Sequence, residues 1–345
     1  MLALSQPPFS FWLAAGVAAL VSCAAIPALL PWLRSIALAK VTDRSSHKVP
    51  TPQGGGLGVL AGLLVALIAL RIAGFQTLPW TQVLALVGIA ALGFIDDIHA
   101  LPASRRIIAQ ALFLLIPFLT MAQVPPGLVA LSPSFSAPVL RVMVVVIGFV
   151  GLLWIVNLTN FMDGLDGIIV ASYAPGLFVA GYLLTALHGE PFGLVAAAAG
   201  AALIGFGVWN WNPAKIFLGD AGSLLIGLIT ALAFWLLLLN HEWPAAILLW
   251  LYPFMDATLT LGRRLARGEQ VWQAHRQHAY QRGVDKGLPV KRVSGLSGLY
   301  ALVAAVVSLA VAGQGAAIGF VAIMTVALLC VAMIVIFHRG RRMSA

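Results

Sequence analysis

The chain has 345 residues, of which 61% are apolar and only 9% carry a formal charge. Its net charge is +9, from 20 Lys and Arg against 11 Asp and Glu. A soluble domain carries roughly 25% charged and roughly 45–50% apolar residues, so this composition excludes a soluble enzyme, a disordered chain and a disulfide scaffold. It predicts an all-α, polytopic integral membrane protein in which residues 1–345 form a single transmembrane domain.

Eleven apolar runs have about the length needed to cross a bilayer as helices. They cover residues 9–33, 55–73, 81–95, 107–123, 141–157, 167–187, 192–210, 221–239, 244–262, 296–312 and 316–337, of which the third and the tenth are short. No cleavable signal peptide is expected, because the stretch before the first run has no positive charge and the run itself is long enough to span. Cys23 and Cys330 lie inside apolar runs, so we expect small hydrophobic roles for them.

The basic residues predict the orientation of the chain. If the segment after the first span is cytoplasmic, 18 of the 20 Lys and Arg lie on the cytoplasmic side and only Arg71 and Arg141 lie outside. The positive-inside rule therefore places the N-terminus outside and the C-terminus in the cytoplasm. The longest loop, residues 263–295, is then cytoplasmic and basic. Nucleic acid is not an expected partner, because the chain has no soluble basic domain.

Acidic residues gather at the cytoplasmic ends of the spans, where charged groups are costly to desolvate and so point to function. Asp96 and Asp97 close the third span. Because neighbouring residues of a helix point about 100° apart, a shared metal ion cannot be assumed for these two carboxylates. We expect one of them to bind Mg²⁺ or a phosphate-bound ion, and the other to orient a group or take a proton.

A second polar cluster lies in the string NLTNFMDGLDG at 157–167. Asn157, Asn160, Asp163 and Asp166 follow one another at a spacing of three. On a helix this spacing gives a polar stripe, whereas the two glycines of the string favour a tight turn. Four amide and acid side chains at the end of an apolar span favour a binding site over a simple helix cap.

A third polar cluster lies at the start of the eighth span, which opens on Asp220. A helix N-terminus attracts an anion, so Asp220 alone is also explained as a helix cap. The backbone amides of Ala221, Gly222 and Ser223 are expected to be free to meet a phosphate.

The basic loop carries His275, Arg276 and His278. Two histidines at this spacing are possible metal ligands, but no Cys or acid beside them completes a zinc set. Phosphate binding is the better interpretation, with binding of lipid headgroups as the alternative. Lys48, just before the second span, has the same two interpretations.

Five strings occur in order between these spans: SSHKVPTPQGGG at 45–56, FIDDIHALPASRRIIAQ at 94–110, NLTNFMDGLDG at 157–167, NPAKIFLGDAGSL at 212–224, and PFMDATLTLGRR with AHRQHAYQRG at 253–264 and 274–283. Together they resemble the polyprenyl-phosphate N-acetylhexosamine-1-phosphate transferases over nearly the whole chain. The last string departs from the multi-histidine motif of the pentapeptide-transferring members and is similar to the branch that initiates O-antigen synthesis.

This resemblance implies roles for individual residues. The catalytic candidates are Asp96, Asp97, Asp163, Asp166, His275 and His278. The candidates for binding the nucleotide and the phosphates are Lys48, Asn157, Asn160, Leu165, Asn210, Phe217, Arg264 and Arg276, with Phe217 matching an aromatic ring that stacks on uracil. The candidate ligands of Mg²⁺, for which Mn²⁺ is a possible substitute, are Asp220 and Asp163.

The expected function is transfer of an aminosugar 1-phosphate, of the GlcNAc, FucNAc or QuiNAc type, from a UDP-sugar to undecaprenyl phosphate at the bacterial inner membrane, with release of UMP. A lipid phosphate is already largely ionised at pH 7, so the need for Asp96 or Asp97 as a general base is unproven, and substrate positioning can suffice. The alternatives are phospho-MurNAc-pentapeptide transfer and a secondary transporter, although a transporter predicts ionisable groups near the middle of the bilayer. Whether the chain forms a homodimer stays open.

Overall fold

A computed structural model describes residues 6–39, 50–121, 137–270 and 275–340 of the chain. The first half contains α1 (Phe9–Ile36), β1 (Leu38–Ala39), β2 (Thr51–Pro52), α2 (Gly56–Ile72), α3 (Trp80–Ile98), α4 (Ala103–Met121), α6 (Ala137–Phe161) and α7 (Ile168–Tyr182). The second half contains a π-helical turn (Leu183–Leu187), α8 (Phe192–Asn210), α9 (Gly219–Leu239), α10 (Trp243–Leu249), α11 (Leu251–Ala266), α12 (Ala279–Asp285), α13 (Val290–Val311) and α14 (Ala316–Arg339).

The predicted all-α membrane fold is confirmed. Within the described ranges, nine helices are long and apolar enough to cross a membrane. The other two predicted spans differ in form, because α2 has only 17 residues and the ninth span is the pair α10 and α11, bent by 68°. Helices dominate because hydrocarbon offers no hydrogen bonds, so each spanning segment must satisfy its own backbone.

Three predicted boundaries need correction. The third and tenth spans are longer than their apolar runs, because the helices continue through polar ends at Asp96–Asp97 and at Lys291–Arg292. The loop predicted at 263–295 is also shorter. Helix α11 runs on to Ala266, α12 forms within the loop, and α13 begins at Val290. A charged residue ends a hydropathy run but not a helix, since Lys and Arg are good helix formers.

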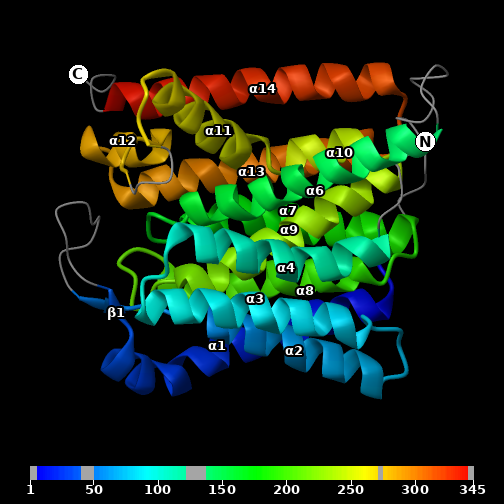
Figure 1. The fold of residues 1–345 in the computed structure, drawn as a ribbon, viewed down its shortest axis with the longest axis horizontal. Coiled ribbons are helices and arrows are strands. Elements are labelled where there is room, and N and C mark those ends of the chain that lie inside the picture. Colours follow the sequence, from blue (N-terminus) through cyan, green and yellow to red (C-terminus); the bar gives the residue numbers. More distant parts are fainter. Residues whose placement is uncertain (1–5, 40–49, 122–136, 271–274, 341–345) are drawn as a thin grey trace.

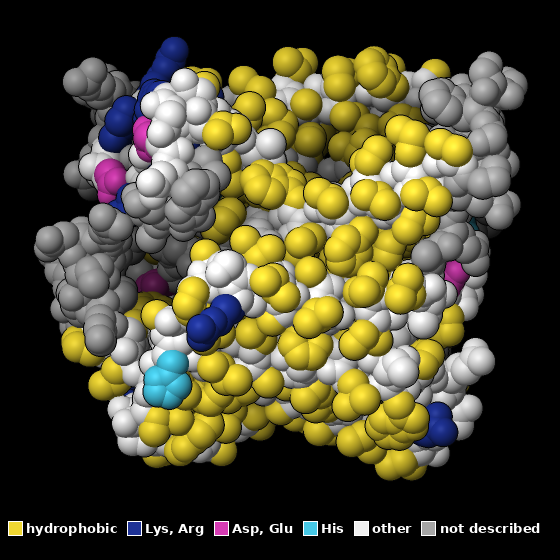
Figure 2. Space-filling view, in the orientation of Figure 1, with side chains coloured by type: hydrophobic (Ala, Val, Ile, Leu, Met, Phe, Trp, Pro, Cys, Tyr) yellow, Lys and Arg dark blue, Asp and Glu magenta, His cyan; other side chains and the backbone are white. Residues whose placement is uncertain are grey.

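The helices lie side by side, with α8 and α9 largely buried between the others (Figure 1). Both are apolar around their whole circumference, as expected for helices without a solvent-facing side. Hydrophobic side chains cover the middle of the face shown in Figure 2, and charged side chains gather at the end that carries α12 and the end of α14 in Figure 1. One end of the bundle therefore concentrates the polar chemistry.

Two glycines let neighbouring backbones reach the start of α9. A Cβ atom on Gly93 of α3 would lie 2.2 Å from the carbonyl oxygen of Asp220, and one on Gly56 of α2 would lie 2.1 Å from the amide nitrogen of Gly222. The short β1–β2 pair continues into this region, where the amides of Gly55 and Gly56 donate to the carbonyls of Phe217 and Leu218. These close approaches fix the start of α9 against α2 and α3.

Candidate active site

Asp97 caps the start of α9 from another helix. Its Oδ1 accepts the amide of Asp220 at 2.8 Å, and its Oδ2 accepts the amide of Ala221 at 3.2 Å. A carboxylate in this place is favoured by the positive end of the helix dipole. The prediction that the Ala221 amide is free for a phosphate is therefore wrong, because Asp97 already occupies it.

Asp96 points to other partners. Its Oδ1 accepts the amide of Leu101 at 2.6 Å, and its Oδ2 lies 3.0 Å from an Nη of Arg106. The same Arg106 nitrogen lies 3.6 Å from Oδ2 of Asp220. The two adjacent carboxylates thus accept hydrogen bonds from different donors, as their different directions on the helix lead one to expect. Sequence reasoning missed Arg106 as a site residue, although its place at the start of the next helix after the acid pair was a usable signal.

Asn160 links the second polar cluster to Asp220. Its Nδ2 donates to Oδ1 of Asp220 at 2.7 Å and lies 2.9 Å from Oγ of Ser223. The structure therefore joins the ends of α3 and α6 with the starts of α4 and α9 into one acid cluster, consisting of Asp96, Asp97, Asp163 and Asp220 with Arg106 and Asn160.

Asp163 is the carboxylate of this cluster whose negative charge has no donor or cation beside it among the described residues. Burial, followed by the negative charges of Asp220 and Asp97, raises the pKa of Asp163 well above its usual value. No hydrogen bond or ion pair to its carboxylate is present among the described residues. A carboxyl group in this position takes up a proton unless a cation lies beside it. In the described ranges, no three Asp, Glu, His or Cys side chains are grouped closely enough to hold a metal ion by themselves.

Asp166 lies in the same turn but has a bonding role. Its Oδ2 accepts the Nδ2 of Asn212 at 2.7 Å and the amide of Ala214 at 3.0 Å. Its carbonyl accepts the hydroxyl of Ser294 at 2.7 Å. The turn predicted from the glycines is confirmed, since α6 ends at Phe161 and Gly167 has a φ of 71°. Asp166 ties this turn to the 212–214 segment and to α13.

Asn210 holds the other side of the turn. Its Oδ1 accepts the amide of Gly167 at 2.9 Å, and its Nδ2 donates to the carbonyl of Ile216 at 2.9 Å. Phe217 follows at once, half-buried, with its amide bonded to Pro52 and its carbonyl to Gly55. Its ring is thus attached to a backbone that is fixed on both sides.

Two further predicted binding residues are buried. Leu165 is packed in the hydrophobic core. Asn157 lies one helical turn before Asn160, where its Nδ2 donates to Oε1 of Gln110 and to the carbonyl of Leu153, each at 2.9 Å. The Asn157–Gln110 pair joins α6 to α4 beneath the acid cluster. Gln110 was not predicted as the partner of Asn157, because the two residues lie on different helices 47 positions apart.

The histidines of the basic loop lie together, with ring centroids 4.7 Å apart for His275 and His278. Burial, with a smaller effect of nearby positive groups, lowers the pKa of His275 to about 4 and that of His278 to about 3. Both rings are therefore neutral at pH 7. A neutral imidazole offers one hydrogen-bond donor and one acceptor.

The two arginines that were predicted to bind substrate are engaged with acids. Nε of Arg264 lies 2.8 Å from Glu269, and an Nη of Arg276 lies 2.7 Å from Asp285. Arg264 is 5% exposed and also donates to the carbonyl of Gln270. Both pairs order the loop around the histidines. The last predicted binding residue, Lys48, lies outside the described residues.

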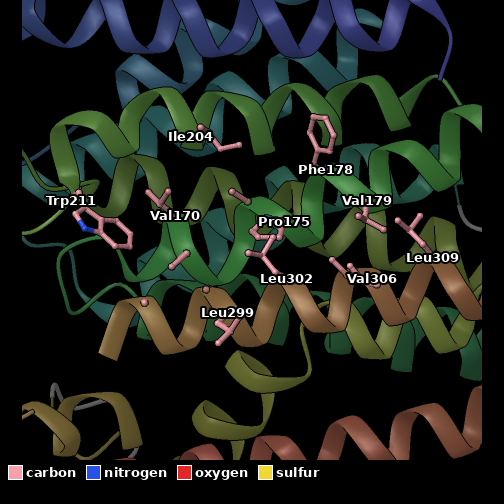
Figure 3. A pocket seen from close by; sticks show the side chains of 15 residues that line it. Val170, Pro175, Phe178, Val179, Ile204, Trp211, Leu299, Leu302, Val306 and Leu309 are labelled. Carbon is pink, nitrogen blue, oxygen red and sulfur yellow. The ribbon is translucent and has the colours of Figure 1, made fainter. Parts of the chain in front are cut away.

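Two apolar hollows open on the outer surface of the bundle. One, of about 570 Å³, lies between α7 and α13 and ends at Trp211 (Figure 3). The other, of about 280 Å³, lies between α6, α9 and α11. Its lining includes Leu158, two residues before Asn160. On α6 the lining of this hollow therefore extends to two residues before Asn160.

Comparison with known proteins identifies similar chains. The description "Glycosyl transferase family 4" applies to the family model that matches residues 79–238. The phospho-N-acetylmuramoyl-pentapeptide-transferase of Staphylococcus carnosus is 30% identical over 242 residues, which cover 62% of this chain and 73% of the relative. The protein of the same name from Bacillus mycoides is 30% identical over 238 residues, covering 62% of this chain and 71% of the relative.

Proposed function

Because the chain belongs to glycosyl transferase family 4, we propose that it transfers an aminosugar 1-phosphate from a UDP-sugar to undecaprenyl phosphate. An oxygen of the lipid phosphate attacks the β-phosphorus of the donor, the bond from that phosphorus to the bridging oxygen breaks, and UMP leaves with the electron pair. The observation that carries this proposal is the acid cluster, in which four carboxylates and Arg106 meet at one end of a membrane bundle. One substrate lies in lipid and the other in water, so the reaction requires a site at such an end.

The acid cluster fits a divalent cation. Asp220 and Asp163 are the residues that we propose to hold Mg²⁺, or Mn²⁺ in its place, because the Asp163 carboxylate has no other compensation among the described groups. A bound Mg²⁺ would neutralise charge on phosphate oxygens. The open arrangement suits Mg²⁺, which commonly combines one or two carboxylates with substrate phosphates.

The protein groups position the two anionic substrates. Arg106 lies between Asp96 and Asp220, so its guanidinium is already in the cluster and can donate a hydrogen bond to a phosphate oxygen there. We propose that the neutral rings of His275 and His278 hydrogen-bond to the diphosphate or to the sugar, His275 from a half-buried position and His278 from a buried one. These groups give the attack its geometry, which is the main demand of phosphoryl transfer.

The uridine of the donor is proposed to stack on Phe217. The backbone of Phe217 is fixed by its bonds to Pro52 and Gly55, so its ring loses little freedom when a base stacks on it. Asn210 and Asp166 hold the neighbouring turn in place. The same proposal puts this end of the bundle at the cytoplasmic face of a bacterial inner membrane, with the N-terminus outside.

The polyprenyl chain of the acceptor is proposed to lie in the hollow between α6, α9 and α11, whose lining on α6 extends to Leu158. Gly151 of α6 lines this hollow, and a Cβ atom on it would meet nothing within 4 Å. Gly295 of α13 has the same open surroundings in the other hollow. Gly151→Leu should therefore raise the KM for undecaprenyl phosphate by about 10-fold, the effect of losing about 1.4 kcal/mol of apolar contact.

Gly295→Leu is the matched control and should leave that KM within about 2-fold of the wild-type value. The measurement is UMP release at varied concentrations of undecaprenyl phosphate in detergent. A raised KM for Gly295→Leu with an unchanged KM for Gly151→Leu would assign the acceptor chain to the hollow between α7 and α13.

The finer proposal is an N-acetylated aminosugar of the GlcNAc, FucNAc or QuiNAc type, as the first step of O-antigen or another envelope polysaccharide. It rests on the 274–283 segment, whose histidine pattern resembles that of the O-antigen branch. The second candidate is transfer of phospho-N-acetylmuramoyl-pentapeptide, which the names of the matching relatives favour. A secondary transporter has no support from the family assignment.

A panel of donors tests the function. We expect the purified protein, with Mg²⁺ and undecaprenyl phosphate, to release UMP from at least one UDP-aminosugar and to form the matching lipid diphosphosugar. UMP release from UDP-MurNAc-pentapeptide alone would establish the second candidate. If the folded protein releases no UMP from any donor, the proposed reaction is wrong. Omission of the lipid phosphate is the control, because UMP release must depend on the acceptor.

A further inference from the structure

One buried acid has no role in the reaction proposed above. Asp256 lies on α11, within the bent span, and is 2% exposed. A charged side chain inside a span is costly unless donors surround it, and such residues are seldom there without a function. Two of its donors come from its own helix, since the hydroxyls of Tyr252 and Thr260 each lie 3.3 Å from its carboxylate.

The other donors of Asp256 come from α12. Its Oδ1 accepts the amide of Ala279 at 2.7 Å, and its Oδ2 accepts the amide of Tyr280 at 3.3 Å. These are the first two amides of the helix, which would otherwise lack partners. His278 immediately precedes them, and its Nδ1 lies 3.8 Å from Oδ1 of Asp256. Asp256 thus holds the start of α12 and the histidine that precedes it.

The far side of α12 touches the turn that carries Asp163. The hydroxyl of Tyr280 donates to the carbonyl of Phe161 at 3.0 Å. A Cβ atom on Gly164 would lie 2.4 Å from that hydroxyl and 2.8 Å from Nε2 of Gln281. A displacement of α12 would therefore move Tyr280 and Gln281 relative to the turn that carries Asp163. The stack of His278 on Tyr280, with centroids 5.7 Å apart and planes 12° apart, couples the histidine to the same contact.

We propose that Asp256 is a positioning residue for phosphoryl transfer: it clamps the start of α12 so that His278 and Tyr280 are held against the 161–164 turn. The inference rests on the proposed function, because it assigns His278 to the substrate side of the site. The carboxylate acts through the backbone of α12 and does not itself meet the substrates.

Asp256→Ala removes the clamp. Positioning errors of about 1 Å can cost roughly 100-fold in rate, so kcat should fall by about that factor while the KM for the UDP-sugar changes by less than about 3-fold. Turnover is counted per molecule that binds UDP stoichiometrically, which removes the effect of misfolded protein. Asp256→Asn keeps an oxygen for the Ala279 amide and should restore kcat to within about 10-fold of wild type.

Glu242→Ala is the matched control. Glu242 is also a buried acid, 4% exposed, and its Oε2 also accepts a backbone amide, that of Gly313 at 3.3 Å. It pairs with His188 at 3.4 Å, away from α12 and the acid cluster. The variant should keep the wild-type kcat per UDP-binding molecule even where its thermal stability falls.

The outcomes separate the two proposals. If the wild-type protein releases no UMP from any donor, the proposed function fails. If the wild type is active and Asp256→Ala keeps its kcat, the clamp is refuted while the function stands. Should Asp256→Ala not fold, Tyr280→Phe takes its place, because it removes only the bond from α12 to Phe161. Wild-type kcat in a folded Tyr280→Phe protein would then overturn the proposal.

Discussion

Asp220→Ala is expected to lower the rate of UMP release by roughly 1,000-fold, since removal of one charge-stabilising group commonly costs 10²–10³ in kcat. Asp220 is where the cluster converges, because its carboxylate meets Asn160 at 2.7 Å and Arg106 at 3.6 Å. Its loss leaves Asp163 as the single proposed metal ligand. The rate is measured over a range of Mg²⁺ concentrations, and the residual activity should no longer saturate with the metal.

The same substitution should not weaken the fold. Asp220 stands among carboxylates of the same sign, so its removal relieves repulsion, and the midpoint of thermal unfolding in detergent should stay level or rise. Glu190→Gln is the control, because Glu190 contacts Asn240 at the end of α9 away from the cluster and should keep wild-type turnover. Wild-type turnover in Asp220→Ala would show that the metal assignment is wrong.

The fold was largely predictable because a lipid environment restricts the backbone conformations that can cross the membrane. A spanning segment must satisfy its own backbone, so apolar length alone predicts a helix. The bend of 68° between α10 and α11 was not predictable in this way. Both pieces are apolar, and the break at Trp250, whose side chain is fully buried, depends on neighbouring helices that hydropathy does not describe.

The composition of the acid cluster was also predictable in part. Asp96, Asp97, Asp163 and Asp220 end or begin spans on one predicted side, so topology alone brings them to one end of the bundle. Their individual partners were not predictable. Whether a carboxylate binds an arginine or a helix N-terminus depends on side-chain direction across three helices, which spacing within one helix cannot give.

Asp256 illustrates the same limit inside the membrane. Its position in a span marks it as costly, but its donors on α12 follow it by more than twenty residues. The loop between them is basic and polar, and its composition does not predict a helix that returns to the span. The proposed role of Asp256 therefore depends on tertiary contacts, which the local sequence does not predict.

The most informative single substitution after Asp220 concerns Asp97, which has two separable properties: it caps α9 and it brings negative charge to the cluster. Asp97→Asn keeps an oxygen for the Asp220 amide but loses the charge. The lost bond and the weaker interaction with the helix dipole should cost about 1 kcal/mol in the free energy of unfolding. Asp97→Ala loses both acceptors and should cost about 2 kcal/mol.

If the charge of Asp97 serves catalysis, both variants should lose roughly 100- to 1,000-fold in UMP release despite their different stabilities. If Asp97 is only a helix cap, activity should follow stability, so that Asp97→Asn stays near wild type and Asp97→Ala is impaired. Thermal unfolding and UMP release measured on the same preparations distinguish these results. We expect the first, because a helix cap alone gives no reason to place a carboxylate beside Asp163 and Asp220, where it adds repulsion that a bound cation would offset.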